Sequence, residues 1–205
     1  FLAGPTVLDG LTFDEVHVDI PEGRTVTNPS LLLTGALKLV LEGNGAYRPA
    51  RVNQGYIGGT VVVGGVAHAV GAGTDCRYGV PGSEIAIGEG AAMEMDGKAG
   101  FQSYRFVLDG GTLRNSTALA NAATTPSIAQ VRVTADSAVD FKQYGFVGAA
   151  GVPVTLDLGG NTLDMSCTDS GYIGSATATR GTLALHGPVA FTAGSTFSGA
   201  ETTLV

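Results

Sequence analysis

Asp140 and Asp164 are the two residues of this sequence best suited to perform catalysis together. Each is the middle residue of a short apolar pattern, at residues 139–141 and 163–165. If these two patterns stack on adjacent coils, the carboxyl groups come within the roughly 5–9 Å that glycoside hydrolysis requires. One carboxyl group can then act as the acid and the other as the base or nucleophile. The pair therefore makes a polysaccharide hydrolase or lyase one hypothesis for the function.

A second group of side chains is suited to binding. Its members fall in two loop-like stretches about one coil apart, and they are Tyr47, Arg48, Arg51, Tyr56, Arg77 and Tyr78. Aromatic rings stack on sugars, and guanidinium groups donate paired hydrogen bonds. These six residues are therefore predicted to contact a glycan or a peptide. The alternative is that they are ordinary loop side chains that bind no ligand.

Other catalytic and metal-binding motifs are missing from the sequence. It has no Gly-x-Ser-x-Gly nucleophile turn and no Gly-x-x-x-x-Gly-Lys phosphate loop. Its histidines, His17, His68 and His186, and its cysteines, Cys76 and Cys167, lack the spacing of zinc ligands. We therefore expect no metal site and no cofactor.

The elements that must position these residues recur along the whole chain. Short alternating apolar patterns occur at residues 18–20, 39–41, 61–63, 85–87, 106–108, 131–133, 156–158 and 183–185, with a spacing of about 23 residues. A second short pattern follows most of them after a turn of small residues, at 93–95, 139–141, 163–165 and 189–191. Alternation with a period of two indicates strands with one face inward.

The repeat predicts a stacked fold. A coil of about 23 residues cannot bury its inward side chains alone, so neighbouring coils must cover them. We predict an all-β fold in which residues 1–205 form one right-handed parallel β-helix, or β-solenoid, of about eight coils. A β-sandwich, which also has short strands and frequent turns, is the alternative.

This stacking places the outward side chains of successive coils in rows. In one row Arg132 lies beside Asp157. A second row is predicted to contain Glu94, Arg114, Asp140, Asp164 and Ala190. Opposite charges on adjacent strands stabilise each other by about 0.2–1 kcal/mol. The same stacking puts Cys76 and Cys167 three or four coils apart by our count of about 23 residues per coil, which is too far for a disulfide.

The composition excludes two classes of partner. The 205 residues include only 11 Lys and Arg, without a basic cluster, and the net charge is -7, so we expect no nucleic acid partner. The longest apolar stretch, residues 31–41, is too short to span a bilayer, so we expect no membrane insertion by this segment. The 32 Gly residues fit a chain with many tight turns, and the charged fraction of 14% fits one without amphipathic helices.

Three segments resemble the repeat unit of autotransporter passenger domains. They are residues 106–113, 154–163 and 181–185, and the second reads VTLDLGGNTL. They are similar to the autotransporter-associated β-strand repeats of large secreted bacterial surface proteins, and the resemblance is best over residues 85–197. It implies a secreted or surface-displayed right-handed β-helix that serves adhesion or acts as a stalk.

We therefore expect a non-catalytic structural or adhesive segment of a β-helical protein, secreted or on the bacterial cell surface. The chain starts at Phe1 and ends at Val205 within an apolar pattern, so we expect a fragment of a longer chain. Its partners are expected to be a host or matrix glycan or protein, and its ends are expected to associate end to end. A polysaccharide-active enzyme and a glycan-binding module on the same scaffold are the alternatives.

Overall fold

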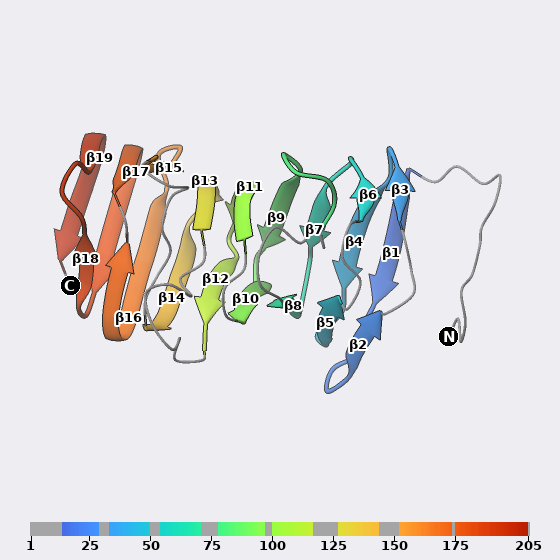
Figure 1. The fold of residues 1–205 in the computed structure, drawn as a ribbon. Coiled ribbons are helices and arrows are strands. Elements are labelled where there is room, and N and C mark those ends of the chain that lie inside the picture. Colours follow the sequence, from blue (N-terminus) through green and yellow to red (C-terminus); the bar gives the residue numbers. More distant parts are fainter. Residues whose placement is uncertain are drawn as a thin grey trace.

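The structure, a computed structural model, is a stack of parallel strands wound as a β-solenoid (Figure 1). It describes residues 14–28, 33–49, 54–70, 78–96, 100–116, 127–143, 152–173 and 175–204. Within these ranges the regular elements are all strands, and the pairings between named strands are all parallel. The prediction of an all-β parallel β-helix is confirmed, and the β-sandwich is wrong.

Two ladders of hydrogen-bonded strands form the stack. The first consists of β1 (Glu15–Asp19), β4 (Lys38–Glu42), β7 (Thr60–Val62), β9 (Glu84–Gly88), β11 (Gly100–Asp109), β13 (Ser127–Ala135), β15 (Val154–Asp157) and the first halves of β17 (Ala176–His186) and β19 (Thr196–Leu204). The second consists of β2 (Thr25–Asn28), β5 (Ala46–Pro49), β8 (Val66–Val70), β10 (Ala92–Asp96), β12 (Thr112–Asn115), β14 (Ser137–Gln143), β16 (Thr162–Ile173) and the second halves of β17 and β19. The chain visits each ladder once per coil.

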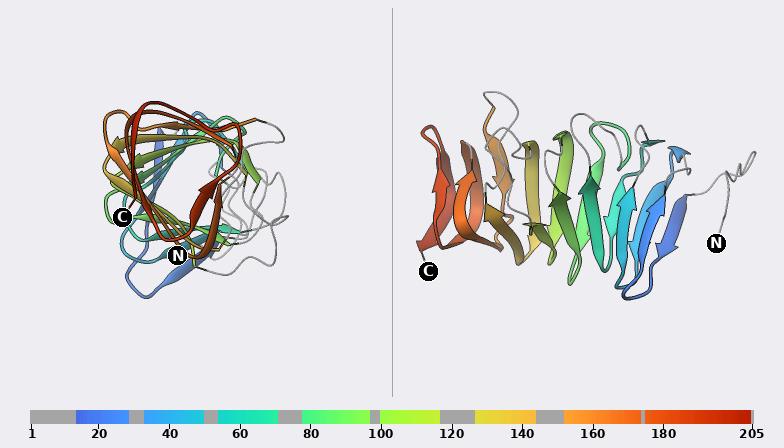
Figure 2. Two further views of the ribbon diagram at one scale, coloured as in Figure 1. Left: turned by 90° about the vertical axis from the view of Figure 1, so that its left-hand side faces the viewer. Right: turned by 60° about the horizontal axis from the view of Figure 1, so that its bottom comes forward.

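Shorter pairings lie outside these two ladders. Strand β3 (Thr34–Gly35) pairs with β6 (Gly55–Tyr56), and β18 (Val189–Phe191) pairs with the end of β16. Seen along the stack, successive coils enclose one interior (Figure 2).

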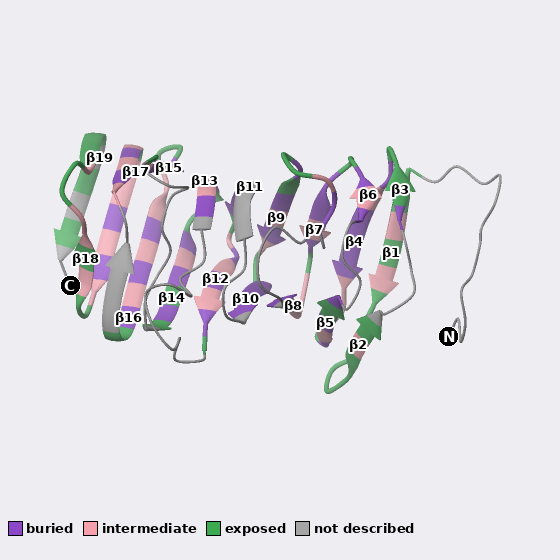
Figure 3. Cartoon of the chain, in the orientation of Figure 1, coloured by how far each residue is buried: buried purple, intermediate pink, exposed green. Residues whose placement is uncertain are grey.

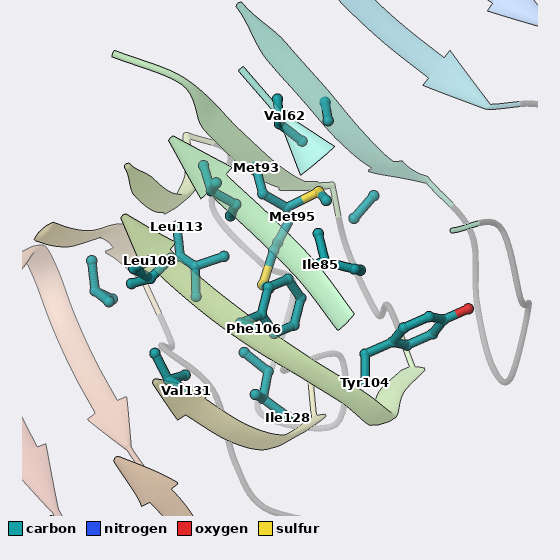
Figure 4. Close-up of a cluster of buried hydrophobic side chains, with 14 of the residues drawn as sticks. Val62, Ile85, Met93, Met95, Tyr104, Phe106, Leu108, Leu113, Ile128 and Val131 are labelled. Carbon is teal, nitrogen blue, oxygen red and sulfur yellow. The ribbon is translucent and has the colours of Figure 1, made fainter. Parts of the chain in front are cut away.

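The inward side chains fill this interior in continuous columns. Buried residues alternate with more exposed ones along the strands, as the period of two predicts (Figure 3). In the middle of the stack, Met93 and Met95 of β10 pack beside Ile85, Phe106 and Leu108 of the first ladder (Figure 4). Each of these five side chains is fully buried. Full burial of one such side chain contributes about 1.5–3 kcal/mol.

On four levels the corner between the two ladders holds small residues. Gly45, Gly65, Ala91 and Gly111 occupy it on successive levels, where each level donates a backbone hydrogen bond to the one before. A Cβ on Gly111 would lie 2.5 Å from Cγ2 of Ile87, and Gly65 has a φ of +65°. Part of the glycine excess is therefore a requirement of close stacking at this corner.

The stack departs from the sequence prediction near its C-terminal end. Residues 183–185 pair with 163–165 in the second ladder, while 176–178 take the predicted place in the first. Strand β18 pairs with residues 171–173 and does not join the second ladder. The coil count therefore differs slightly from the expected eight. The physical reason is that β16 and β17 are long strands, and β17 turns the corner at Arg180 and Gly181 without a separate turn of small residues.

The structure describes one of the two cysteines. Cys167 is buried on β16, and its Sγ donates to the backbone carbonyl oxygen of Lys142 at 3.7 Å. Cys76 lies outside the described residues, so the prediction that the two cysteines stay unbridged remains untested. No helix long and apolar enough to cross a membrane occurs in the described ranges.

The core columns predict a difference between two truncations. Leu163 is fully buried on β16, whereas Val63, just after β7, is 51% exposed. We expect Leu163→Ala to lower the free energy of unfolding by about 2–5 kcal/mol, because it leaves a cavity between levels. Val63→Ala should change it by less than about 0.5 kcal/mol. Chemical denaturation followed by circular dichroism measures both, and equal losses would contradict this register.

Candidate functional site

One outward row of the second ladder gathers many of the polar groups that the sequence singled out. Its members take the same register position on successive levels: Arg48, His68, Glu94, Arg114, Asp140, Ser166 and His186. We call this row the polar column. The predicted succession of Glu94, Arg114 and Asp140 is confirmed, because each is the Cα partner of the next.

Glu94 is the most buried charged residue of the polar column, at 4% exposure. Its carboxylate accepts hydrogen bonds from Nε of Arg114 at 2.9 Å, from the backbone N–H of Ser116 at 2.6 Å and from the Ser116 hydroxyl at 2.7 Å. Three donors, one of them charged, offset the cost of removing this carboxylate from water. The cluster joins β10 to the end of β12, which indicates a structural role.

The predicted catalytic pair is not aligned in the way the sequence suggested. Asp140 pairs in register with Ser166, whereas Asp164 pairs with Ala138 on one side and Ala184 on the other. Asp164 therefore belongs to the neighbouring outward row. The prediction that Asp140 and Asp164 stack in one row is wrong.

The error is a shift of two residues. The apolar patterns around the two aspartates look alike, yet Val139 pairs with Met165 and not with residue 163. A shift of two keeps every apolar side chain facing inward, so the core does not distinguish the two alignments. In the observed alignment, Oδ1 of Asp136 accepts a hydrogen bond from the backbone N–H of Thr162 at 2.7 Å, a contact that the predicted alignment would not place in register.

Two members of the C-terminal part of the polar column, Ser166 and His186, contact different carboxylates. The Ser166 hydroxyl donates to Oδ1 of Asp140 at 2.9 Å, and Nε2 of His186 lies 3.0 Å from Oδ1 of Asp164. Ser166 and His186 are Cα partners on adjacent levels. An activated serine nucleophile needs its hydroxyl bonded to the imidazole, with the imidazole oriented by the carboxylate. Here the serine is hydrogen-bonded to one carboxylate and the histidine lies beside another.

The outward row of the first ladder is also paired across levels. Arg132 is the Cα partner of Asp157, as predicted. Their side chains, however, pair elsewhere: Nη2 of Arg132 lies 3.3 Å from Oε2 of Glu84, and Nη2 of Arg180 lies 2.7 Å from Oδ1 of Asp157. Long side chains thus reach diagonal positions that Cα register alone does not indicate.

The three tyrosines of the predicted binding group are core residues. Tyr47, Tyr56 and Tyr78 are 5%, 0% and 1% exposed. The Tyr56 hydroxyl shares a 2.6 Å hydrogen bond with Oγ1 of Thr60, and the Tyr78 hydroxyl donates to the backbone carbonyl of His68 at 2.7 Å. Burial raises the pKa of Tyr56 far above its ordinary value. The interpretation of these rings as loop residues facing a ligand is therefore corrected.

Of the three arginines in the same group, the structure describes Arg48. Arg48 is exposed on β5, and its Nη2 lies 3.2 Å from Nδ1 of His68. Arg51 and Arg77 lie outside the described residues. Ligand binding by this group as a whole remains a prediction. In the described ranges, no three His, Cys, Asp or Glu side chains are grouped so that they could hold a metal ion.

A charge cluster lies at the N-terminal end of the first ladder. His17 of β1 is held by two carboxylates: its Nδ1 is 2.9 Å from Oε1 of Glu42 and its Nε2 is 3.1 Å from Oε2 of Glu15. Lys38 donates to Oε1 of Glu15 at 2.9 Å. Hydrogen bonds to Glu42 and then Glu15 raise the pKa of His17. Hydrogen bonds from Lys38 and then His17 lower the pKa of Glu15.

These pKa shifts predict how the attachment of β1 depends on pH. The raised pKa of His17 gives a stabilisation that is complete below its ordinary value of 6.5 and is lost as pH rises through the higher value in the folded chain. The lowered pKa of Glu15 gives a second stabilisation, which is present above the ordinary value of 4.5. It is lost as pH falls through the lower pKa that Glu15 has in the folded chain. We expect His17→Gln to destabilise the chain more at about pH 5.5 than at about pH 9.

Denaturation curves at the two pH values measure this effect. Glu42→Gln removes the first partner of His17, so His17→Gln should have a smaller pH dependence in that background. The same loss of stability at both pH values would show that the imidazole charge does not hold β1 on β4.

Comparison of the chain with models of known protein families, with curated proteins and with solved structures finds no match. The β-solenoid architecture is in line with autotransporter passenger domains. The resemblance of the sequence to their repeats is therefore supported by the fold alone.

Proposed function

We propose that this chain is a non-catalytic structural or adhesive segment of a β-helical protein that bacteria secrete or display on their surface. The observation that supports this proposal is the continuity of the two ladders, which run from β1 and β2 to β19. The proposed location, secreted or on the bacterial surface, rests on the resemblance of residues 85–197 to autotransporter repeats.

Charged side chains strengthen this continuity because they join one level to another. Among the described residues, ion pairs between levels include Lys38 with Glu15, Arg114 with Glu94, Arg132 with Glu84 and Arg180 with Asp157. In a solenoid each coil contacts mainly its neighbours, so resistance to extension along the axis depends on such contacts. These links suit a segment that holds its shape between two attachment points.

The sequence also suggested an enzyme acting on polysaccharides. Asp140 and Asp164 are the described residues on which that hypothesis depends, and they lie in different rows with separate partners. A glycan-binding module was the other alternative, and its three rings are buried. Neither alternative gains a supporting contact from the described residues.

Single-molecule pulling of the full chain from its two ends tests the structural role. We expect coils to detach one at a time, in extension steps of about 80 Å for about 23 residues. Glu94→Ala should lower the force of one step, because it removes the three hydrogen bonds that join β10 to the end of β12. Glu84→Ala is the matched control and should lower the force less, since its pair with Arg132 is exposed on both sides. Extension without steps would contradict the proposal that contacts between neighbouring coils resist force along the axis.

A panel of neutral and acidic polysaccharides separates the proposal from the enzyme alternative. We expect the release of reducing ends or unsaturated products to be no higher for the wild type than for the double variant Asp140→Asn/Asp164→Asn. Both substitutions keep the size of the side chain and remove its charge. Product release that is lost in the double variant, with an unchanged circular dichroism spectrum, would overturn the non-catalytic proposal.

A further inference from the structure

Asn44 and Gly45 are neighbours in the chain that can react with each other. Asn44 is the only asparagine of the sequence that precedes a glycine, and it is exposed in the turn between β4 and β5. Asparagine is one of the chemically labile residues of proteins, because the backbone nitrogen of the next residue can attack its side-chain carbonyl carbon. Glycine obstructs this attack least, since it has no Cβ. The turn therefore contains the two groups that spontaneous deamidation requires.

Water is the one co-reactant of this reaction. The Gly45 amide loses its proton, its nitrogen forms a bond to Cγ of Asn44, and the bond from Cγ to the side-chain nitrogen breaks, so that ammonia leaves with that proton. Water then opens the resulting five-membered succinimide ring at one of its two carbonyl carbons. Opening at one carbon gives aspartate. Opening at the other gives isoaspartate, in which the backbone runs through the former side chain and is one carbon longer.

The stacking of the first two described levels holds the attacking nitrogen in a hydrogen bond. The N–H of Gly45 donates to the backbone carbonyl oxygen of Ile20, on the preceding level, at 2.8 Å. The next N–H, of Ala46, donates to the carbonyl oxygen of Arg24 at 2.8 Å. The first bond retains the proton that the reaction must remove, and the two bonds together fix the backbone after Asn44 in the ladder. The stacked chain is therefore protected from deamidation at this turn.

Close packing at Gly45 gives a second form of protection. Gly45 is buried, and a Cβ on it would lie 2.5 Å from the carbonyl oxygen of Pro21 and 2.7 Å from that of Arg24, and would also meet the side chain of Ile20. Ring closure and the longer isoaspartate backbone both need space at this point, and a close-packed interior does not provide it. The reaction therefore requires that the two levels separate first.

Separation of two levels is a local event in this fold. In a solenoid each coil contacts mainly its neighbours, so one interface can open while the others stay closed. The contacts across this interface include the one between His17 and Glu42 and the packing of the fully buried Ile20 side chain. A few local contacts thus determine how often Gly45 is released.

We propose that Asn44–Gly45 is a deamidation site that stacking keeps unreactive, and that it reacts when the level of β1 separates from the level of β4. The longer backbone of isoaspartate does not fit the stacked turn, so the reaction makes a transient separation permanent. It also adds a negative charge to a turn that follows Glu42, whose Cα partner on the preceding level is Asp19. The site thus records chemically that this interface has opened.

Peptide mass spectrometry of the full chain, sampled during incubation at neutral pH, measures deamidation at Asn44. We expect the folded chain to react at least about tenfold more slowly than the same chain unfolded in guanidinium chloride. Ile20→Ala should raise the folded rate about tenfold or more, because it removes buried packing at this interface and leaves the backbone acceptor in place. Val18→Ala, a smaller truncation on β1, should raise it less, and it gives the same test if Ile20→Ala does not fold.

Leu163→Ala is the matched control, because it truncates a fully buried aliphatic side chain on β16, several levels away. It should leave the rate at Asn44 unchanged. The same rate in Ile20→Ala and Leu163→Ala, whether raised or not, would overturn the proposal, since the contacts of this one interface would then not control the reaction. Equal rates in the folded and the unfolded wild type would also overturn it, since stacking would then give no protection.

Discussion

The fold depends on the parallel hydrogen-bond ladder between equivalent strands of successive coils. Once one level is bonded to the next, every inward side chain falls on another inward side chain, as in the column from Val16 to Phe197. The same bonding stacks outward side chains in rows, so ion pairs form between levels. Glycine at positions 45, 65 and 111 follows from it as well, because the preceding level lies too close at these positions for a Cβ.

Much of the fold could be predicted from the sequence because its signal is local and repeated. Alternation shows which residues face inward, and the spacing shows that the strands stack in coils. The outward neighbours Glu94 and Arg114, and Arg132 and Asp157, were identified on this basis.

The candidate site could be predicted less well, for two physical reasons. Tyrosine carries an apolar ring and a polar hydroxyl, so its type alone does not indicate whether it is buried. Tyr56 and Tyr78 are buried because their hydroxyl groups bond to the Thr60 side chain and the His68 backbone carbonyl, and no spacing pattern marks these partners. The alignment of Asp140 with Asp164 failed because alternation is unchanged by a shift of two. The contact between Asp136 and Thr162 that accompanies the observed register has no pattern in the sequence.

That two-residue ambiguity has an evolutionary consequence. A turn that gains or loses two residues moves the following strand along its neighbour while its apolar side chains return to the same interior. The chain could therefore exchange which polar groups meet on its surface, as Asp140 meets Ser166 here, without redesign of the core. In such a protein, turn length is a heritable means of varying surface chemistry on a constant framework.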